Sequence, residues 1–379
     1  MANIAIVGAG LMGRLLALLI TKQHQVTLYE QGELNTSDAT GRIAAAMIAP
    51  TAESVVASDD IVYMGHASLA LWPDLLSYLD LDVTLQQAGT IILAHRQDEA
   101  DLLSFKQRVK LQTSDDLQTL TAAELHLIEP EISSQFAQIV YLPNEGQIYN
   151  DELYQASAEA ILKSDITLKL HTEIKLNNLN RCIQGNSEPL NQLTELPIGK
   201  QVTYDWVIDC RGLGAKSDLL NVNKALRGVR GEVIRVKAPE VNITRPVRLM
   251  HPRYPLYIVP KGDHEYVIGA TEIESEDNKP SSVRSALELL SAAYSVHKGF
   301  AEASIESMKV GLRPTLNDNE PSIDVSQSYI QINGLYRHGY LLAPYLLQQV
   351  LEQLNCAMPD ELSFSQQHFN TTNQLVTPA

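Results

Sequence analysis

The sequence predicts a mixed α/β protein, α+β overall, in which a parallel βαβ unit opens the chain and a second lobe is built on an antiparallel sheet. Two patterns carry this prediction. A short apolar run stops at glycines before an apolar helix, and apolar and polar residues alternate between residues 227 and 270. The length of 379 residues also exceeds the roughly 250 to 300 at which a single core stops growing. We therefore expect two lobes with a ligand cleft between them.

The N-terminal elements have the spacing of a parallel βαβ crossover. Residues 4–7 form a strand-like run, residues 11–20 are apolar over most of a helix, and residues 26–29 form a second strand. Further helices are expected at 58–79, 97–111, 122–128, 151–163, 281–296 and 342–355, with strands at 90–94 and 202–209. Alternating runs at 231–236, 256–259 and 266–269 predict the antiparallel sheet, and the polar tail after residue 364 is expected to fray.

The charge balance excludes two classes of partner. Lys and Arg number 29 against 45 for Asp and Glu, which gives a formal net charge of −16. Without a basic stripe, neither nucleic acid nor an anionic membrane is an expected partner. A small anionic substrate would need a specific internal cation, because the overall field repels it.

The three cysteines, Cys182, Cys210 and Cys356, are widely spaced and odd in number, which fits neither a disulfide framework nor a metal site. Arg14 interrupts the apolar N-terminal run, and no uncharged stretch is long enough to span a bilayer. We expect a cytoplasmic protein without a metal. The sequence does not decide between a monomer and a homo-oligomer.

The segment from Gly8 to Gly13 reads G-x-G-x-x-G directly after a strand and at the start of a helix. Gly8 suits the tight turn, Gly10 allows a pyrophosphate to approach the backbone, and Gly13 allows the helix to pack on the strand. The motif alone is weak evidence. Glu30 strengthens it, because a carboxylate at the end of the second strand can accept hydrogen bonds from ribose hydroxyls. The sequence thus predicts a Rossmann-like domain for FAD or NAD rather than NADP.

Motifs spread along the rest of the chain separate these two dinucleotides. They are 40–50 with Glu53, 129–130, 146–148, 227–233, 257–261, 267–271, 311–314 and 334–344. In this order they resemble the flavin-dependent D-amino-acid oxidase superfamily, and within it the glycine oxidases of thiamine biosynthesis. The resemblance implies FAD. Some relatives bind the flavin through a cysteine thioether, but Cys356 lies just past the last expected helix and outside the motif, so we expect non-covalent FAD. The resemblance further implies an FAD-binding domain from residues 1–80, 145–222 and 306–379, and a substrate domain from 81–144 and 223–305.

The resemblance also implies which residues contact the cofactor. These are Gly8, Gly10, Leu11, Met12, Gly13, Glu30, Arg42, Ala45, Ala46, Met47, Gly212, Arg313, Gly339, Tyr340, Leu341 and Leu342. The last residues precede or open a helix, whose positive end can stabilise negative charge on the flavin.

Four residues are candidates for the substrate site. Arg313 is the expected carboxylate clamp, because a guanidinium fork binds a carboxylate through two hydrogen bonds. The resemblance gives Tyr257 a supporting hydroxyl, and Arg337 is the next candidate cation. His338 either lines the mouth of the site or faces solvent from a loop.

The expected reaction is oxidation of glycine to the imine, with oxygen as co-substrate and hydrogen peroxide as co-product. The imine either hydrolyses to glyoxylate or enters thiamine thiazole synthesis. A close alternative is an oxidase or dehydrogenase acting on sarcosine or a D-amino acid. A more distant alternative is a flavoprotein that acts on a partner protein. Pocket volume would separate the small amines, and the sequence does not report it.

Overall fold

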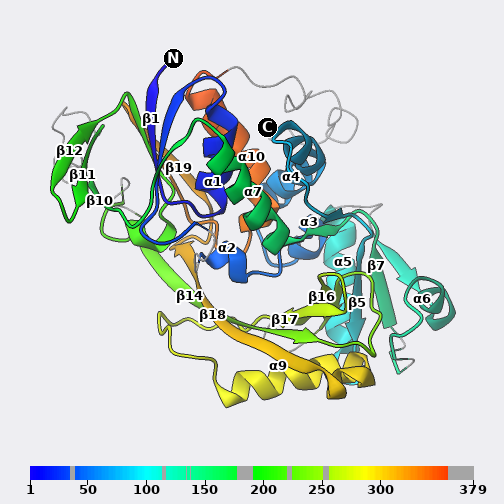
Figure 1. The fold of residues 1–379 in the computed structure, drawn as a ribbon. Helices are drawn as coiled ribbons and strands as arrows, with labels where there is room; N and C mark the ends of the chain where they lie inside the picture. Colours follow the sequence, from blue (N-terminus) through cyan, green and yellow to red (C-terminus); the bar gives the residue numbers. More distant parts are fainter. Residues whose placement is uncertain are drawn as a thin grey trace, which may run out of the picture.

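Two large sheets organise the molecule, one in each half (Figure 1). The computed structural model describes residues 1–34, 39–112, 117–133, 135–136, 138–176, 191–219, 224–250 and 256–356. Cys182 and the tail after residue 364 lie outside the described residues. The mixed α/β fold with a Rossmann-like unit and a second, largely antiparallel sheet is confirmed.

The first large sheet has six strands in the order β19-β20-β13-β1-β2-β9. They are β1 (Asn3–Val7), β2 (Gln25–Tyr29), β9 (Thr167–Lys169), β13 (Trp206–Asp209), β19 (Ser322–Ser326) and β20 (Tyr329–Asn333). Neighbours pair in parallel except β19, which is antiparallel to β20. The five parallel strands, β1, β2, β9, β13 and β20, therefore end at the same edge, which is where ligands bind in open α/β sheets.

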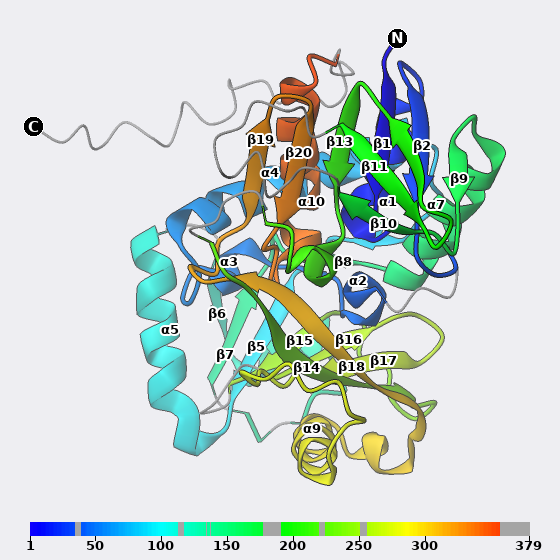
Figure 2. The ribbon, with the colours of Figure 1, turned by 90° about the vertical axis from the view of Figure 1, so that its left-hand side faces the viewer.

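Helices and a small sheet cover the two faces of this sheet. Helices α1 (Leu11–Ile20), α4 (Asp59–Tyr78), α7 (Asn150–Lys163) and α10 (Gly339–Gln353) share one hydrophobic core with it. The antiparallel strands β10 (Glu173–Leu176), β11 (Gln192–Leu196) and β12 (Lys200–Thr203) pack against the other face (Figure 2). This half of the molecule therefore has three layers.

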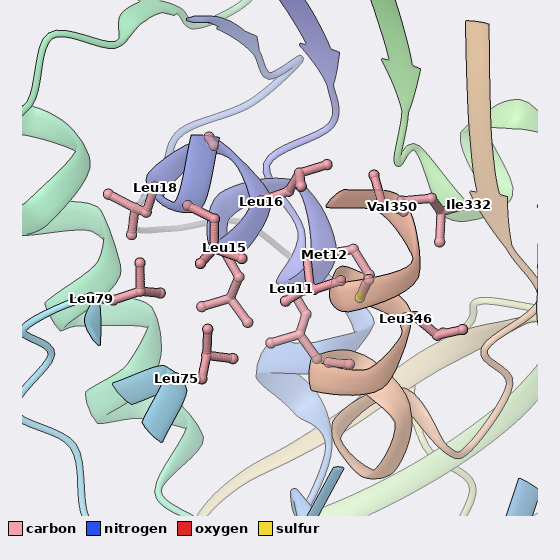
Figure 3. Packing of buried hydrophobic residues seen from close by; sticks show 14 of the residues in the cluster. Leu11, Met12, Leu15, Leu16, Leu18, Leu75, Leu79, Ile332, Leu346 and Val350 are labelled. Atoms are coloured by element: carbon pink, nitrogen blue, oxygen red, sulfur yellow. The ribbon is translucent and has the colours of Figure 1, made fainter. Parts of the chain in front are cut away.

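Helix α1 lies at the centre of this core. All ten of its residues are buried, as the nearly continuous apolar sequence requires. Figure 3 shows its side chains between Leu75 of α4 and the following Leu79 on one side and Leu346 and Val350 of α10 on the other. The helix start, which faces the cleft, is thereby held rigidly.

Arg14 is the exception to the apolar sequence of α1, yet it is fully buried. Its guanidinium donates to the carbonyl oxygens of Ala9 at 2.9 Å, Leu34 at 3.2 Å and Tyr154 at 2.9 Å. A buried charge needs such hydrogen bonds, and here they tie the glycine turn to α7. Arg14, which interrupts the apolar sequence, thus connects the glycine turn to α7.

The second large sheet has eight strands in the order β18-β14-β17-β16-β15-β5-β7-β6. They are β5 (Thr90–Ala94), β6 (Gln118–Leu120), β7 (Gln138–Leu142), β14 (Leu226–Lys237), β15 (Val247–Leu249), β16 (Leu256–Pro260), β17 (Glu265–Gly269) and β18 (Ser304–Leu316). Helix α9 (Val283–Val296) packs against this sheet through Leu289, Ala293 and Val296.

Helix α5 and several shorter elements complete the described chain. They are α2 (Thr40–Ile43), α3 (Pro50–Glu53), α5 (Glu99–Gln112), α6 (Ala122–Ile128), β3 (Met47–Ile48), β4 (Leu85–Gln86) and β8 (Gly146–Ile148), with 3₁₀ turns at Arg96–Asp98, Gly212–Ala215 and Lys298–Glu302. Strands β3, β8 and β4 form a small sheet. Segments α2 to α3 and strand β18 both run along the cleft, so they carry residues of the site.

Two sequence expectations differ from the structure. The single strand expected at 202–209 is two strands, β12 and β13, which belong to different sheets. The chain turns between them because Asp205 is fixed to Asn3 by two hydrogen bonds, one from each backbone N–H. The second lobe is also not wholly antiparallel, since β15 pairs in parallel with β5.

Three further sequence expectations concern boundaries and absences. The division into two discontinuous domains stays a prediction, and β18 runs across its boundary at residue 306. Within the described ranges, no helix has the length and apolar character needed to cross a membrane. The same residues contain no cluster of three or more His, Cys, Asp or Glu that could hold a metal ion.

Candidate active site

A cleft of about 850 Å³ lies between the two large sheets. Its lining includes Val7, Tyr29 and Asn333 at the strand ends of the first sheet, and Gly231 and Arg313 from the second sheet. Because the parallel strands end here, the nucleotide motif and the candidate substrate residues face one continuous space. We call the part near Gly8 and Glu30 the nucleotide end and the part near Arg313 the substrate end.

The glycine turn at the nucleotide end has little room for side chains. Gly8 has φ +98°, and a Cβ added to Gly13 would lie 1.9 Å from the carbonyl oxygen of Gly8. A Cβ added to Gly10 would meet no protein atom within 4 Å, and Gly10 lines the cleft. The space at Gly10 is therefore open to a ligand. Helix α1 begins there without a side-chain cap, so its free N–H groups suit a pyrophosphate.

Glu30 lies at the end of β2 and lines the same end of the cleft. Its Oε2 accepts a hydrogen bond from the backbone N–H of Ala9 at 2.8 Å, and its Oε1 accepts one from Gly32 at 3.0 Å. The carboxylate is thus held in one orientation, and its remaining lone pairs can accept hydrogen bonds from ribose hydroxyls. These features fit a dinucleotide.

Most of the other residues expected to contact the cofactor also line the cleft. They are Leu11, Met12, Ala45, Ala46, Met47, Gly212, Gly339, Tyr340 and Leu341. Arg42 and Leu342 do not: the Arg42 guanidinium lies 3.6 Å from the Asp151 carboxylate, and Leu342 is fully buried in the core. Gly13 is also outside the lining, where its contact with Gly8 serves helix packing.

Arg313 at the substrate end is placed by β18 and by a glycine of the neighbouring strand. Its Nη1 and Nη2 donate to the carbonyl oxygen of Thr271 at 3.3 and 3.2 Å. A Cβ added to Gly231 would lie 2.5 Å from its Cζ, so the guanidinium lies directly on the β14 backbone. Sequence reasoning missed this role of Gly231, although a glycine in the middle of a strand can mark such a close approach.

The guanidinium of Arg313 also differs from the other arginines of the cleft in its ion pairing. Four arginines line the cleft, and three of them, Arg211, Arg248 and Arg337, pair with a carboxylate. Arg313 forms no ion pair with any carboxylate in the part of the chain that the structure describes. Its charge is therefore available to an anionic ligand.

Tyr257 on β16 lies next to Arg313. In the sheet it is paired with Gly269, where an added Cβ would lie 2.9 Å from its hydroxyl. Burial raises the pKa of Tyr257, and the charge of Arg313 opposes that rise. The hydroxyl therefore stays protonated at neutral pH and can donate a hydrogen bond beside the guanidinium.

Five charged or titratable side chains form a second group at the substrate end, which we call the charged cluster. They are Glu53, Arg248, Glu272, Arg337 and His338. Arg337 bonds Glu53 through Nη2 at 2.7 Å and Glu272 through Nη1 at 2.9 Å. Arg248 lies 3.1 Å from the other oxygen of Glu53. Burial alone would raise the pKa of Glu53, but Arg337 and Arg248 hold it well below its ordinary value.

His338 is 4% exposed and lines the cleft, which excludes the alternative of a solvent-facing histidine. Its Nε2 lies 3.2 Å from Glu53, and its carbonyl oxygen accepts the N–H of Leu342 at 2.9 Å, at the start of α10. Sequence reasoning assigned no role to Arg248 or Glu272. Neither belongs to a recognisable motif, and both are defined by contacts with Glu53 and Arg337 from distant segments.

The chain matches the profile of the family described as FAD dependent oxidoreductase (DAO) over residues 3–348. It is 31% identical over 353 residues to a Rhizobium etli protein provisionally named thiamine biosynthesis oxidoreductase ThiO, covering 93% of this chain and 96% of that one. It is 26% identical over 356 residues to a glycine oxidase of Geobacillus kaustophilus, covering 90% of each.

Solved structures agree with this match in fold. The crystal structure of glycine oxidase from Bacillus cereus superposes with a TM-score of 0.79 at 23% identity, covering 94% of this chain and 97% of that one. The glycine oxidase structure from Geobacillus kaustophilus gives a TM-score of 0.78 at 24% identity and covers 99% of both chains.

Proposed function

The chain belongs to the family of FAD-dependent oxidoreductases, and on that premise we propose that it oxidises glycine, or a similarly small amine, to the imine. Oxygen is the co-substrate and hydrogen peroxide the co-product. The names of the similar proteins, a thiamine biosynthesis oxidoreductase and a glycine oxidase, support this choice of substrate and a product that feeds thiamine synthesis.

The observation that carries the proposal is the guanidinium of Arg313 at the substrate end, which forms no ion pair among the described residues. A protein of net charge −16 repels a free carboxylate, so an amino acid needs a local cation that is not already neutralised. Arg313 meets that need, because the cleft's other arginines pair with carboxylates. Its fork can bind both carboxylate oxygens, and the Tyr257 hydroxyl can add a third hydrogen bond.

The residues of this chain would position the substrate, and the cofactor would carry the electrons. FAD, when bound, supplies the acceptor for the hydride of the α C–H bond. Gly8, Gly10 and Glu30 would hold its nucleotide part, and the segment around Ala46 and Gly339 would flank the remainder. Clamping the carboxylate at Arg313 fixes the distance of the α-carbon from that acceptor, and this positioning is a large part of catalysis.

The cofactor should be released intact when the protein is denatured. Cys210 lines the cleft, but burial raises the pKa of its thiol, and the neighbouring Asp209 charge raises it further. A protonated thiol is a poor nucleophile, which argues against a thioether to the flavin at this position. Flavin that remains with the acid-precipitated chain would contradict this part of the proposal.

The experiment that tests the function is peroxide release by the FAD-loaded enzyme with glycine, sarcosine and D-alanine as separate substrates. We expect the highest kcat/KM with glycine. A higher kcat/KM with sarcosine or D-alanine would identify the protein as an oxidase of that amine instead. Reduction of an artificial electron carrier without peroxide would indicate a dehydrogenase, and no turnover of free amines would favour an action on a partner protein.

Two further predictions belong to the same proposal. The product's role is tested in a strain that lacks its own glycine oxidase: expression of this protein should restore growth in medium without thiamine.

A cytoplasmic location is supported by the free thiols of Cys210 and Cys356, which suit a reducing compartment. Fractionation of cells would test that location directly.

A further inference from the structure

Among the arginines and glutamates that the structure describes at the substrate end, positive charges outnumber negative charges by one. Arg337 pairs directly with Glu53 and Glu272, Arg248 pairs with Glu53, and Arg313 lines the same end of the cleft. Burial raises the pKa of the Tyr257 hydroxyl, and the charges of Arg313, Arg248, Glu53 and Arg337 also act on it. Burial also raises the pKa of Tyr336, on which Glu272, Arg337 and Arg313 act, so the five charges lie around the same part of the cleft. Their sum leaves a single uncompensated cation, which matches a ligand with one carboxylate.

Glu272 decides this balance from a half-buried position. Its side chain is 34% exposed and lines the cleft, whereas Glu53 is 13% exposed. Glu272 occupies Nη1 of Arg337 at 2.9 Å, while Glu53 occupies Nη2 at 2.7 Å. Burial raises the pKa of Tyr336, and hydrogen bonding to Glu272 contributes to that rise. Glu272 is thus the outer of two carboxylates that together use both terminal nitrogens of Arg337.

The backbone holds Glu272 in this place from both sides. Thr271 donates its N–H to the carbonyl oxygen of Glu232 at 3.2 Å. On the other side, Ile273 exchanges two backbone hydrogen bonds with Arg230, at 2.9 and 3.0 Å. The carboxylate is therefore presented to Arg337 by strand-like pairing and not by a free loop.

We propose that Glu272 determines substrate specificity by occupying Arg337, so that the enzyme accepts amines with one carboxylate and rejects amines with two. This inference rests on the proposed function, in which Arg313 binds the first carboxylate. A second carboxylate on the substrate would have to displace Glu272 from Arg337, or stay unpaired beside two carboxylates. Both arrangements are unfavourable, because one carboxylate is then left without its cation next to another negative charge.

The test compares ligands that differ by one carboxylate. Sarcosine and iminodiacetate are the oxidisable pair, and methoxyacetate and diglycolate are the corresponding pair without an amine. Binding of the second pair is measured through the change in flavin absorbance of the FAD-loaded protein, which needs no turnover. The wild-type enzyme should favour the monocarboxylate of each pair.

The diagnostic variant is Glu272→Gln, which keeps the side-chain volume and removes the charge. It should shift the ratio of diglycolate to methoxyacetate affinity toward the dicarboxylate by roughly ten- to a hundredfold, the gain from one newly available charge-assisted hydrogen-bond donor. The ratio of kcat/KM for iminodiacetate to that for sarcosine should shift in the same direction. In Glu272→Gln/Arg337→Gln the gain should disappear, because the second cation is gone.

Glu274→Gln is the matched control. It removes the same charge two residues along, where Glu274 pairs with Arg227 at 3.1 Å outside the cleft lining. It should leave both ratios unchanged. A wild-type preference for the dicarboxylates, or an unchanged ratio in Glu272→Gln, would overturn the inference even if glycine is a good substrate. Failure of the proposed function would appear differently, as wild-type protein that turns over neither glycine nor sarcosine.

Discussion

The two ends of the cleft are built in different ways. At the nucleotide end, the glycine turn and Glu30 come from one stretch of about 20 residues, and backbone groups make the decisive contacts. At the substrate end, the contacts join side chains far apart in the chain: Arg248 and Glu53 are separated by 195 positions, and Arg337 and Glu53 by 284. A short motif can therefore specify the first end, whereas the second exists only once both sheets have assembled.

This difference implies that the two ends can be damaged separately. Changes at the glycine turn should affect FAD binding first, and changes around Arg313 should affect the amine substrate while FAD stays bound. The variants below test that separation, beginning with the largest expected effect.

Gly13→Ala should remove FAD binding. The new Cβ would lie 1.9 Å from the backbone oxygen of Gly8, and neither atom can move without shifting α1 or β1. Flavin absorbance of the purified protein and its melting temperature measure the effect. Gly10→Ala is the comparison, because its Cβ meets no protein atom: it should weaken FAD binding without lowering the melting temperature of the apoprotein. Full flavin content in Gly13→Ala would refute the assignment.

Glu145, at the junction between the two halves, should make the free energy of unfolding depend on pH. It is fully buried between β7 and β8, and Oε1 accepts the N–H of Ala52, the neighbour of Glu53. Burial raises its pKa from 4.5 to about 7. The folded state therefore keeps a proton that the unfolded state loses between these pH values, so this contribution to stability falls as pH rises from 4.5 to 7, by about 3 kcal/mol in all.

Glu145→Gln cannot ionise, so it should gain stability relative to the wild type as pH increases across that interval. Urea unfolding of both proteins at pH 5, 6, 7 and 8 measures the difference. The gap should widen up to about pH 7 and then stay constant. A difference that is the same at all four pH values would contradict a raised pKa at this position.

Glu30→Ala should weaken FAD binding by about 1.5 to 3 kcal/mol, because it removes charge-assisted hydrogen bonds. In the structure these include the one that fixes Ala9, so part of the loss comes from a looser glycine turn. Titration of apoprotein with FAD measures it. At saturating FAD the KM for glycine should match the wild type, since the substrate end is untouched. A raised KM with normal FAD affinity would reverse the assignment of the two ends.

Gly231→Ala should affect the substrate end and leave FAD binding unchanged. Its Cβ would lie 2.5 Å from the Arg313 guanidinium, which is the mobile end of a side chain and would be pushed aside. We expect normal FAD content and a rise in KM for glycine that corresponds to about 1 to 3 kcal/mol. Gly228→Ala on the same strand meets the side chains of Leu213 and Leu312 and serves as the control. Equal effects of the two variants would show that Arg313 is not held by Gly231.

Much of the nucleotide end could be predicted from the sequence, because its physics is local. The G-x-G-x-x-G spacing, the strand before it and Glu30 are neighbours in the chain and in space. The helix expected at 122–128 and the strand expected at 90–94 also have the observed bounds. The break in the strand expected at 202–209 could not be predicted from the sequence, because it depends on a contact between Asp205 and Asn3, 202 positions apart.

The substrate end could be predicted only in part. Arg313, Tyr257, Arg337 and His338 were found through the family motifs, and the structure places all four on the cleft. Gly231 was noted within a motif, but only the β14–β18 pairing shows that it supports Arg313. For Glu272 the sequence gives no signal, because its partner Arg337 is 65 positions away. The charges that balance one another across a cleft are a property of the assembled fold.

The central claim is that Arg313 clamps the substrate carboxylate while other residues hold FAD. Its most direct test measures flavin content and kcat/KM for glycine in Arg313→Ala and Arg313→Lys, with Lys309→Ala on the exposed part of β18 as a control for charge. We predict wild-type flavin content in all three. In Arg313→Ala, kcat/KM should fall by roughly one to four decades. Lys should restore part of this loss, because an ammonium lacks the fork. Arg313→Ala with bound FAD and unaltered kcat/KM for glycine would contradict the account.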